Sequence, residues 1–80
     1  MSVQTLESVR AEALFASDVQ ISEQPTSERV RMAVIRSVQQ HGSRGCTEIV
    51  AQEFGEHPET AARRMLWVLR AVRSVYPAAA

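Results

Sequence analysis

The sequence lacks lysine and has a single cysteine, three glycines and four aromatic residues among its 80 positions. One cysteine cannot form an internal disulfide, which favours an intracellular protein. No apolar run approaches the roughly 18 residues that a membrane span needs. The opening residues also show no basic region followed by an apolar stretch, as a signal peptide would. We therefore expect a soluble, cytoplasmic protein without a membrane partner.

The net charge is zero, which by itself argues against a nucleic-acid partner. The charges are unevenly distributed, however. Residues 1–28 carry one arginine against five carboxylates, a net charge of −4. Residues 29–80 carry eight arginines against four carboxylates, a net charge of +4. An acidic first third and a basic remainder can still present one positive face to a partner.

The spacing of apolar residues predicts an all-α fold of about four helices, because no stretch alternates as a strand would. The predicted helices span residues 3–17, 26–40, 43–54 and 58–76, and the polar residues 18–25 form a linker. Thr26 or Ser27 can cap the second helix, and Gly42 ends it. These elements make one domain over residues 1–80, with a helical core at 26–76. So small a domain gains from burying more surface in a dimer.

Three of the helices carry an apolar face that we expect to be buried. These faces are Val3, Leu6, Val9, Ala13 and Leu14 on the first helix, Val30, Val34, Ile35 and Val38 on the second, and Ala61, Met65, Leu69, Val72 and Tyr76 on the last. Phe15 points away from the first of them. The N-terminal helix is therefore expected to pack between two surfaces or to meet another subunit.

The run TEIVAQEFGEHPETAARRML, from Thr47 to Leu66, has the layout of a helix-turn-helix. Ala51 supplies a small residue where a second helix would cross the first. Gly55 suits a turn that needs positive φ, and Pro58 suits the first position of the next helix. The alternative is an ordinary helical corner, in which glycine and proline are also common.

In a DNA-binding helix-turn-helix, the second helix enters the major groove and its first turns contact base edges. The predicted DNA-binding residues are Arg44, His57, Glu59, Thr60, Arg63, Arg64 and Trp67. Arginine is the usual bidentate partner of guanine, so Arg63 and Arg64 are the main candidates. The alternative is a solvated face on which Glu59 pairs with Arg63. Trp67 is expected to pack against the N-terminal helix, or else against a second subunit.

The remaining polar residues give no support for a metal site or for catalysis. His41, Cys46 and His57 match no zinc spacing, and no fourth ligand is evident. We expect Cys46 in the core, and His57 at a helix cap or a phosphate. The sequence has no glycine-rich phosphate loop, and the GSRG at 42–45 is expected to be a turn from which Arg44 reaches a phosphate. We expect no enzymatic activity, no cofactor and no small-molecule effector.

Two resemblances concern the stretch from Arg29 to Val72. Its layout is similar to the helix-turn-helix at the N-terminus of insertion-element transposases, although the acidic leader and the lack of lysine depart from them. The opening MSVQTLESVRAEALFAS and the segment EFGEHPETAARRM resemble small helix-turn-helix proteins of actinomycetes, in particular the streptomycete GATC-binding nucleoid-associated family. That resemblance covers most of the chain. It implies an abundant chromosome-coating protein that binds GATC sites as a dimer through Thr60, Arg63 and their neighbours.

The sequence thus predicts a sequence-preferring protein of double-stranded DNA, nucleoid-associated and architectural or a small transcription regulator. The competing interpretation is a helical protein–protein module, such as an adaptor or an antitoxin-like partner. Phosphate contacts are expected at Arg29, Arg36, Arg44 and Arg73. We also expect a homodimer with the N-terminal helix at or next to the interface, because one helix-turn-helix reads only a few base pairs.

Overall fold

A computed structural model describes residues 5–77 of the chain. It contains three α-helices and one short 3-10 helix: α1 (Leu6–Ala16), η1 (Ile21–Glu23), α2 (Ser27–Glu56) and α3 (Pro58–Val75). There is no strand within residues 5–77. The predicted all-α class is therefore confirmed, but the structure has three α-helices where the sequence predicted four.

The helix α2 has two arms because Gly42 interrupts its helical geometry. Gly42 has φ 70° and ψ 166°, and it is the residue within α2 that departs from helical angles. We call residues 27–41 the N-terminal arm of α2 and residues 43–56 its C-terminal arm. The predicted break at Gly42 is thus present as a bend within one helix. The N-terminal arm starts as predicted, since the Thr26 side chain accepts a hydrogen bond from the backbone N–H of Arg29.

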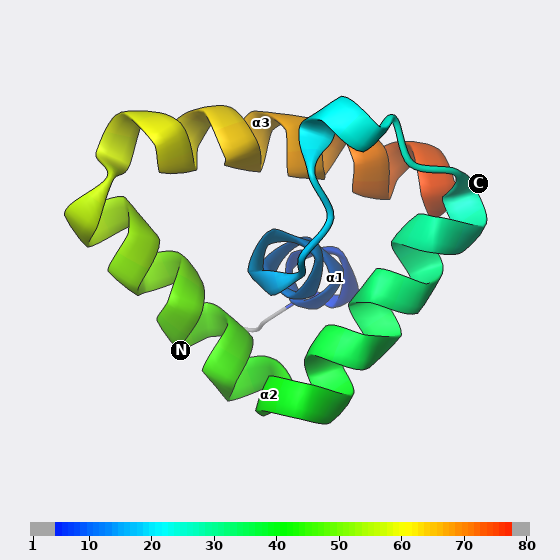
Figure 1. Ribbon diagram of the computed structural model, residues 1–80. Helices are drawn as coiled ribbons and strands as arrows, with labels where there is room; N and C mark the ends of the chain where they lie inside the picture. Colours follow the sequence, from blue (N-terminus) through cyan, green and yellow to red (C-terminus); the bar gives the residue numbers. More distant parts are fainter. Residues whose placement is uncertain (1–4, 78–80) are drawn as a thin grey trace.

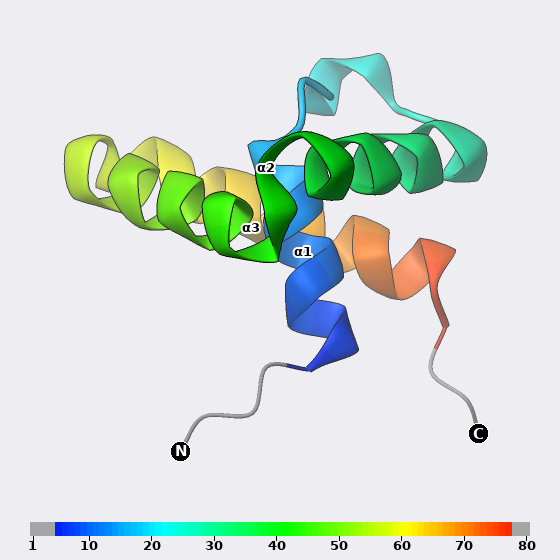
Figure 2. The same ribbon diagram turned by 90° about the horizontal axis from the view of Figure 1, so that it is seen from below.

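The two arms of α2 and the helix α3 form three sides of a triangle around α1, which is seen end-on in Figure 1. The turned view shows α1 running through this layer (Figure 2). Its N-terminal end lies on one side of the layer, and the segment 17–26 with η1 lies on the other. The first helix is therefore the centre of the domain and not an appendage to it.

Enclosure on several sides changes which residues of α1 are buried. Ala11, Ala13, Leu14 and Phe15 are all buried, although they point in different directions around the helix. Of the two expectations for this helix, packing between two surfaces is confirmed, and contact of Phe15 with another subunit is wrong. Its side chain is only 4% exposed, and its ring stacks on Phe54 with the ring centroids 6.1 Å apart. Leu6 was predicted to be buried but is 62% exposed; Val3 lies outside the described residues.

The core faces of α2 and α3 are rotated slightly from the predicted ones. The buried positions are Val30, Ala33, Val34 and Ser37 on the N-terminal arm of α2, and Ala61, Val68, Val72 and Val75 on α3. The predicted core residues Ile35 and Val38 are instead 47% and 37% exposed. Cys46 is buried as predicted, and its thiol donates a hydrogen bond to the Ser37 carbonyl oxygen at 3.7 Å. Burial raises the pKa of this thiol, and the Glu12 carboxylate raises it further.

The backbone conformation at Gly42 can be tested directly by substitution. We expect Gly42→Ala to lower the free energy of unfolding by about 1–3 kcal/mol, because φ 70° with ψ 166° is a region that essentially only glycine occupies. An added Cβ at Gly42 would meet no atom within 4 Å, so the backbone alone causes the cost. Urea unfolding followed by circular dichroism measures the change.

Gly55→Ala is the matched control, because Gly55 is helical and also has no atom within 4 Å of an added Cβ. We expect this variant to be as stable as the parent or more stable by up to about 1 kcal/mol, since alanine favours helix over glycine. Equal destabilisation by both substitutions would contradict the assigned backbone at one of the two glycines.

Candidate nucleic-acid interface

The corner between α2 and α3 differs from the predicted turn. The helix α2 continues to Glu56, and His57 alone separates it from α3. Gly55 lies inside the helix and has no positive φ, so its predicted role in the turn is wrong. Ala51 is exposed and is not at a helix crossing. Pro58 does open α3 as predicted, because its missing N–H needs no partner at that position.

The side of α3 that points away from α1 forms a continuous exposed surface. Its residues are all exposed, and we call them the outer face of α3: Glu59, Ala62, Arg63, Leu66, Arg70 and Ser74. The opposite side of the helix is buried against the core. In Figure 1, α3 forms one edge of the triangle around α1.

Five of the nine arginines are engaged inside the domain. Arg29 pairs with Asp18 at 3.2 Å and with Glu23 at 3.5 Å, and Arg73 pairs with Glu7 at 2.9 Å. Arg10 lies over the ring of Tyr76, 4.0 Å from its centroid. The remaining engaged residues are Arg31, which donates to the Val75 carbonyl oxygen at 3.2 Å, and Arg64. Acidic residues of the segment 1–28 thus pair with arginines of the segment 29–80. The expectation that Arg29 and Arg73 are free for phosphates is therefore corrected.

The other four arginines have no hydrogen bond, ion pair or ring contact within residues 5–77, and all four are exposed: Arg36, Arg44, Arg63 and Arg70. Arg63 and Arg70 share the outer face of α3, two turns apart. The pair between Glu59 and Arg63 that a solvated face could form is absent from the described ion pairs. The Arg63 guanidinium is therefore available to a ligand.

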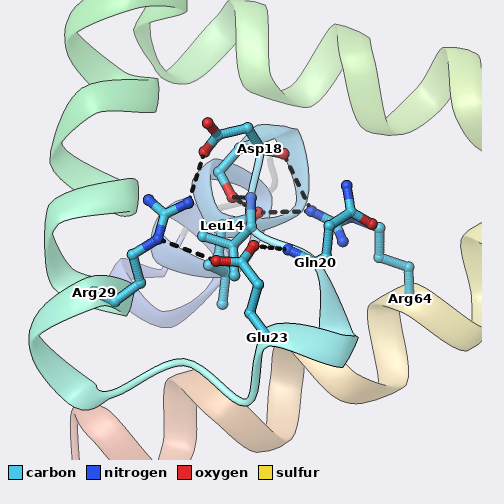
Figure 3. Close-up of polar contacts among 8 residues, drawn as sticks. Leu14, Asp18, Gln20, Glu23, Arg29 and Arg64 are labelled. Atoms are coloured by element: carbon cyan, nitrogen blue, oxygen red, sulfur yellow. Dashed lines mark hydrogen bonds and ion pairs between the residues drawn. The ribbon is translucent and has the colours of Figure 1, made fainter.

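Arg64 has a different position from Arg63, although the two are neighbours. Its Nε donates to the Phe15 carbonyl oxygen at 3.0 Å, and its terminal nitrogen donates to those of Leu14 and Ser17 at 3.3 and 3.2 Å. These oxygens lie at the C-terminal end of α1, where the last carbonyls have no donor four residues later in the helix and carry partial negative charge. Figure 3 shows the Arg64 side chain reaching this end of α1.

The same contacts explain the electrostatics of Arg64 and correct its predicted role. Burial lowers the pKa of its guanidinium, and the Glu53 carboxylate acts in the opposite direction. The Phe15 and Trp67 rings lie 5.5 and 5.9 Å from its central carbon. A group held by three carbonyl oxygens and two aromatic rings is occupied, so Arg64 is not available for base contacts. It joins α3 to the end of α1.

The structure brings together some of the other predicted DNA-binding residues and separates one. His57, Glu59 and Thr60 are exposed around the first turn of α3, next to Arg63. The His57 side chain makes no capping hydrogen bond, which corrects that part of its expectation. The bend of α2 is the corner of the triangle opposite α3 (Figure 1). Arg44 follows this bend by two residues and so is not part of the same surface.

Trp67 lies at the edge of the outer face and is half-buried. It packs against the core and lines a shallow pocket of about 260 Å³ together with Gln24 and Pro25, the segment that leads into α2. Thr60 and Arg63 line another open recess, of about 350 Å³, whose other wall is Gln20, Ile21 and Ser22 around η1. The segment 20–25 therefore runs along one border of the outer face.

Two residues of the outer face were missed as site candidates from the sequence. Arg70 is seven residues after Arg63, and this spacing already places both on one side of a helix. Leu66 lies between them and is 60% exposed. The sequence did not show how α3 is rotated about its own axis. The predicted buried stripe therefore left open whether Leu66 is buried or exposed.

Other kinds of site find no geometric basis in the described residues. Within residues 5–77, no group of three or more histidine, cysteine or acidic side chains is placed to hold a metal ion. No helix in the same range is both long enough and apolar enough to cross a membrane. The comparisons with protein-family models, with curated proteins and with solved structures find no match for this chain. The resemblance to actinomycete helix-turn-helix proteins therefore stays a prediction from the sequence.

Proposed function

We propose that this protein binds double-stranded DNA by placing the outer face of α3 in the major groove. The observation that carries the proposal is the pair Arg63 and Arg70, two exposed guanidinium groups without partners within residues 5–77 on one face of an anchored helix. Seven helical residues span about 10.5 Å, which is close to three base-pair steps of about 3.4 Å. Each arginine can therefore meet a guanine on its own base pair.

In this proposal, the C-terminal arm of α2, His57 and α3 act as the helix-turn-helix, with a one-residue corner and α3 as the recognition helix. Thr60 is exposed in the first turn, where it can contact a phosphate or a thymine methyl, and Glu59 can accept from cytosine N4. The one-residue connection at His57 and the Arg64 contacts to α1 set the direction of α3 relative to the domain. Such a unit suits an architectural nucleoid protein or a small transcription regulator, with GATC sites as the first sequences to test.

The homodimer is part of the same proposal, but with a different interface. Since α1 is enclosed by α2 and α3, it cannot offer its Phe15 side to a partner. Met32 and Ile35 are instead 41% and 47% exposed on the outside of the N-terminal arm of α2. A second copy docking on this pair would bury apolar surface and leave the outer face of α3 free. Sedimentation of the intact chain measures the association.

The alternative function is a helical module that binds another protein. The exposed apolar side chains Met32, Ile35 and Leu66 favour it, as does the zero net charge. The two functions are distinguished by DNA binding and by its dependence on arginine. Phosphate binding makes log affinity fall linearly with log salt, whereas a contact through exposed apolar side chains depends much less on salt.

We expect Arg63→Ala and Arg70→Ala each to weaken binding to a preferred duplex by about 1–3 kcal/mol while the fold remains intact. Fluorescence anisotropy with 20-base-pair duplexes, random or containing GATC, measures the affinity at two salt concentrations. Because the proposal places both arginines on guanines, the variants should also lose sequence preference, whereas a lost phosphate contact would instead reduce the slope of log affinity against log salt by about 0.9.

Arg73→Ala is the matched control for these variants. It removes the same charge from the same helix, but Arg73 is paired with Glu7 and lies in the last turn of α3. We expect it to change the affinity much less than either of the other substitutions. Equal losses from all three variants would indicate a response to charge alone. No binding by the intact protein at low salt would contradict the proposed function.

A further inference from the structure

Leu66 is an exposed apolar side chain in the middle of a charged surface. It is 60% exposed, and it lies three residues after Arg63 and four before Arg70 on the outer face of α3. Ala62 is the only other apolar member of this face within the described residues. An apolar patch of one leucine and one alanine is far smaller than a protein–protein interface requires.

The charges around Leu66 indicate which partner would cover it. Arg63 and Arg70 flank it, and neither has a partner within residues 5–77. Unpaired guanidinium groups on both sides complement a polyanion, and the major groove presents one apolar group to such a side chain, the C5 methyl of thymine. The helical rise places Leu66 about 4.5 Å from Arg63 and 6 Å from Arg70 along the axis. That is one to two base-pair steps.

We propose that Leu66 is a specificity-determining residue that selects thymine through contact with its C5 methyl group, next to the base pairs that Arg63 and Arg70 contact. This inference rests on the proposed function, since it requires the outer face of α3 to lie in the major groove. It adds a chemical preference that the arginines cannot supply. Guanidinium groups recognise guanine, whereas an aliphatic side chain distinguishes thymine from the three bases that lack a methyl group at this position.

The experiment removes only the methyl group from the DNA. Sites are first enriched from a random 20-base-pair pool with the intact protein, and the enriched duplexes are then made with either thymine or uracil. We expect the intact protein to bind the uracil duplexes about three- to five-fold more weakly, the effect of burying roughly one methyl group. Leu66→Ala should bind the two forms equally, with an affinity close to that of the intact protein for uracil DNA.

Leu6→Ala is the matched control, since Leu6 is 62% exposed and lies on α1, outside the face of α3. It should keep the full preference for thymine. Equal binding of thymine and uracil duplexes by the intact protein overturns the role of Leu66, and so does a preference for thymine that persists in Leu66→Ala. Loss of self-association in Leu66→Ala without any change in DNA binding would overturn it too, by assigning Leu66 to a protein contact.

The failure of this inference can be told apart from the failure of the proposed function. If Arg63→Ala loses affinity while the methyl group has no effect, DNA binding by the outer face stands and only the role of Leu66 is withdrawn. If the intact protein binds no duplex of the pool at low salt, the proposed function itself fails.

Discussion

A chain that begins at residue 18 is expected not to fold by itself. Removing residues 1–17 takes away the helix around which α2 and α3 pack, including Ala13 and Leu14, which have no exposed surface, and Phe15. It also removes the carbonyl oxygens that accept from Arg64. If this helix lay at a dimer interface, as the sequence predicted, its removal would weaken self-association and DNA binding together. The structure leads us to expect the loss of helical circular dichroism and of a cooperative thermal transition.

A graded version of the same test uses single substitutions in α1. We expect Leu14→Ala to cost about 2–5 kcal/mol, as deletion of a fully buried leucine does. A domain of this length has a total stability of only about 4–12 kcal/mol. Leu6→Ala, on the exposed part of the same helix, should cost less than about 0.5 kcal/mol. A fragment 18–80 that melts cooperatively at the temperature of the intact chain would contradict the central position of α1.

The positions of helix ends could be predicted largely from local signals. Thr26 accepts a hydrogen bond from the first turn of α2, and Pro58 begins α3, because capping and a fixed φ act within a few residues. Gly42 bends the chain because no other residue adopts its backbone angles as easily. Gly55 misled the prediction for the same reason, since a residue that tolerates positive φ also tolerates a helix. Glycine permits a turn but does not require one.

What covers each apolar face could not be predicted, because periodicity shows that a face is apolar and not which element meets it. Phe15 lies opposite the main apolar stripe of α1, and this pattern fits either an enclosed helix or a helix between two subunits. The structure shows enclosure by α2 and α3, with Phe15 against Phe54. Ile35 is the reverse case, since it completes an apolar stripe in the sequence yet lies on the outside of α2.

Which arginine belongs to the candidate site depends on a rotation of about 100° around the axis of α3. This is the angle between successive residues of a helix with 3.6 residues per turn. Arg63 and Arg64 are the same residue type in the same turn, so the sequence treats them as equivalent. The C-terminal end of α1 decides between them, because its last carbonyl oxygens accept hydrogen bonds from Arg64, whereas Arg63 lies on the outer face. That end is some 50 residues earlier in the chain, and no local pattern connects the two.

Replacing Arg64 by methionine is expected to destabilise the domain by about 2–4 kcal/mol. Methionine keeps much of the apolar stem but donates no hydrogen bond, so the carbonyl oxygens of Leu14, Phe15 and Ser17 lose a charged donor. Hydrogen bonds to a charged group are each worth about 1.5–3 kcal/mol, and three that share one side chain contribute less than their sum. Urea unfolding of the intact chain and of Arg64→Met measures the difference.

Arg63→Met makes the comparison sharp, because it is the same substitution at the next residue. We expect it to leave the urea midpoint almost unchanged, since Arg63 is exposed and has no partner within residues 5–77, and to weaken DNA binding. Arg64→Met should show the opposite pattern at a temperature where it is still folded, with lowered stability and nearly unchanged affinity for DNA. Arg64→Lys should restore only part of the stability, because lysine lacks the planar fork that reaches several oxygens at once. Equal midpoints for the two methionine variants would contradict the assignment of Arg64 to the end of α1.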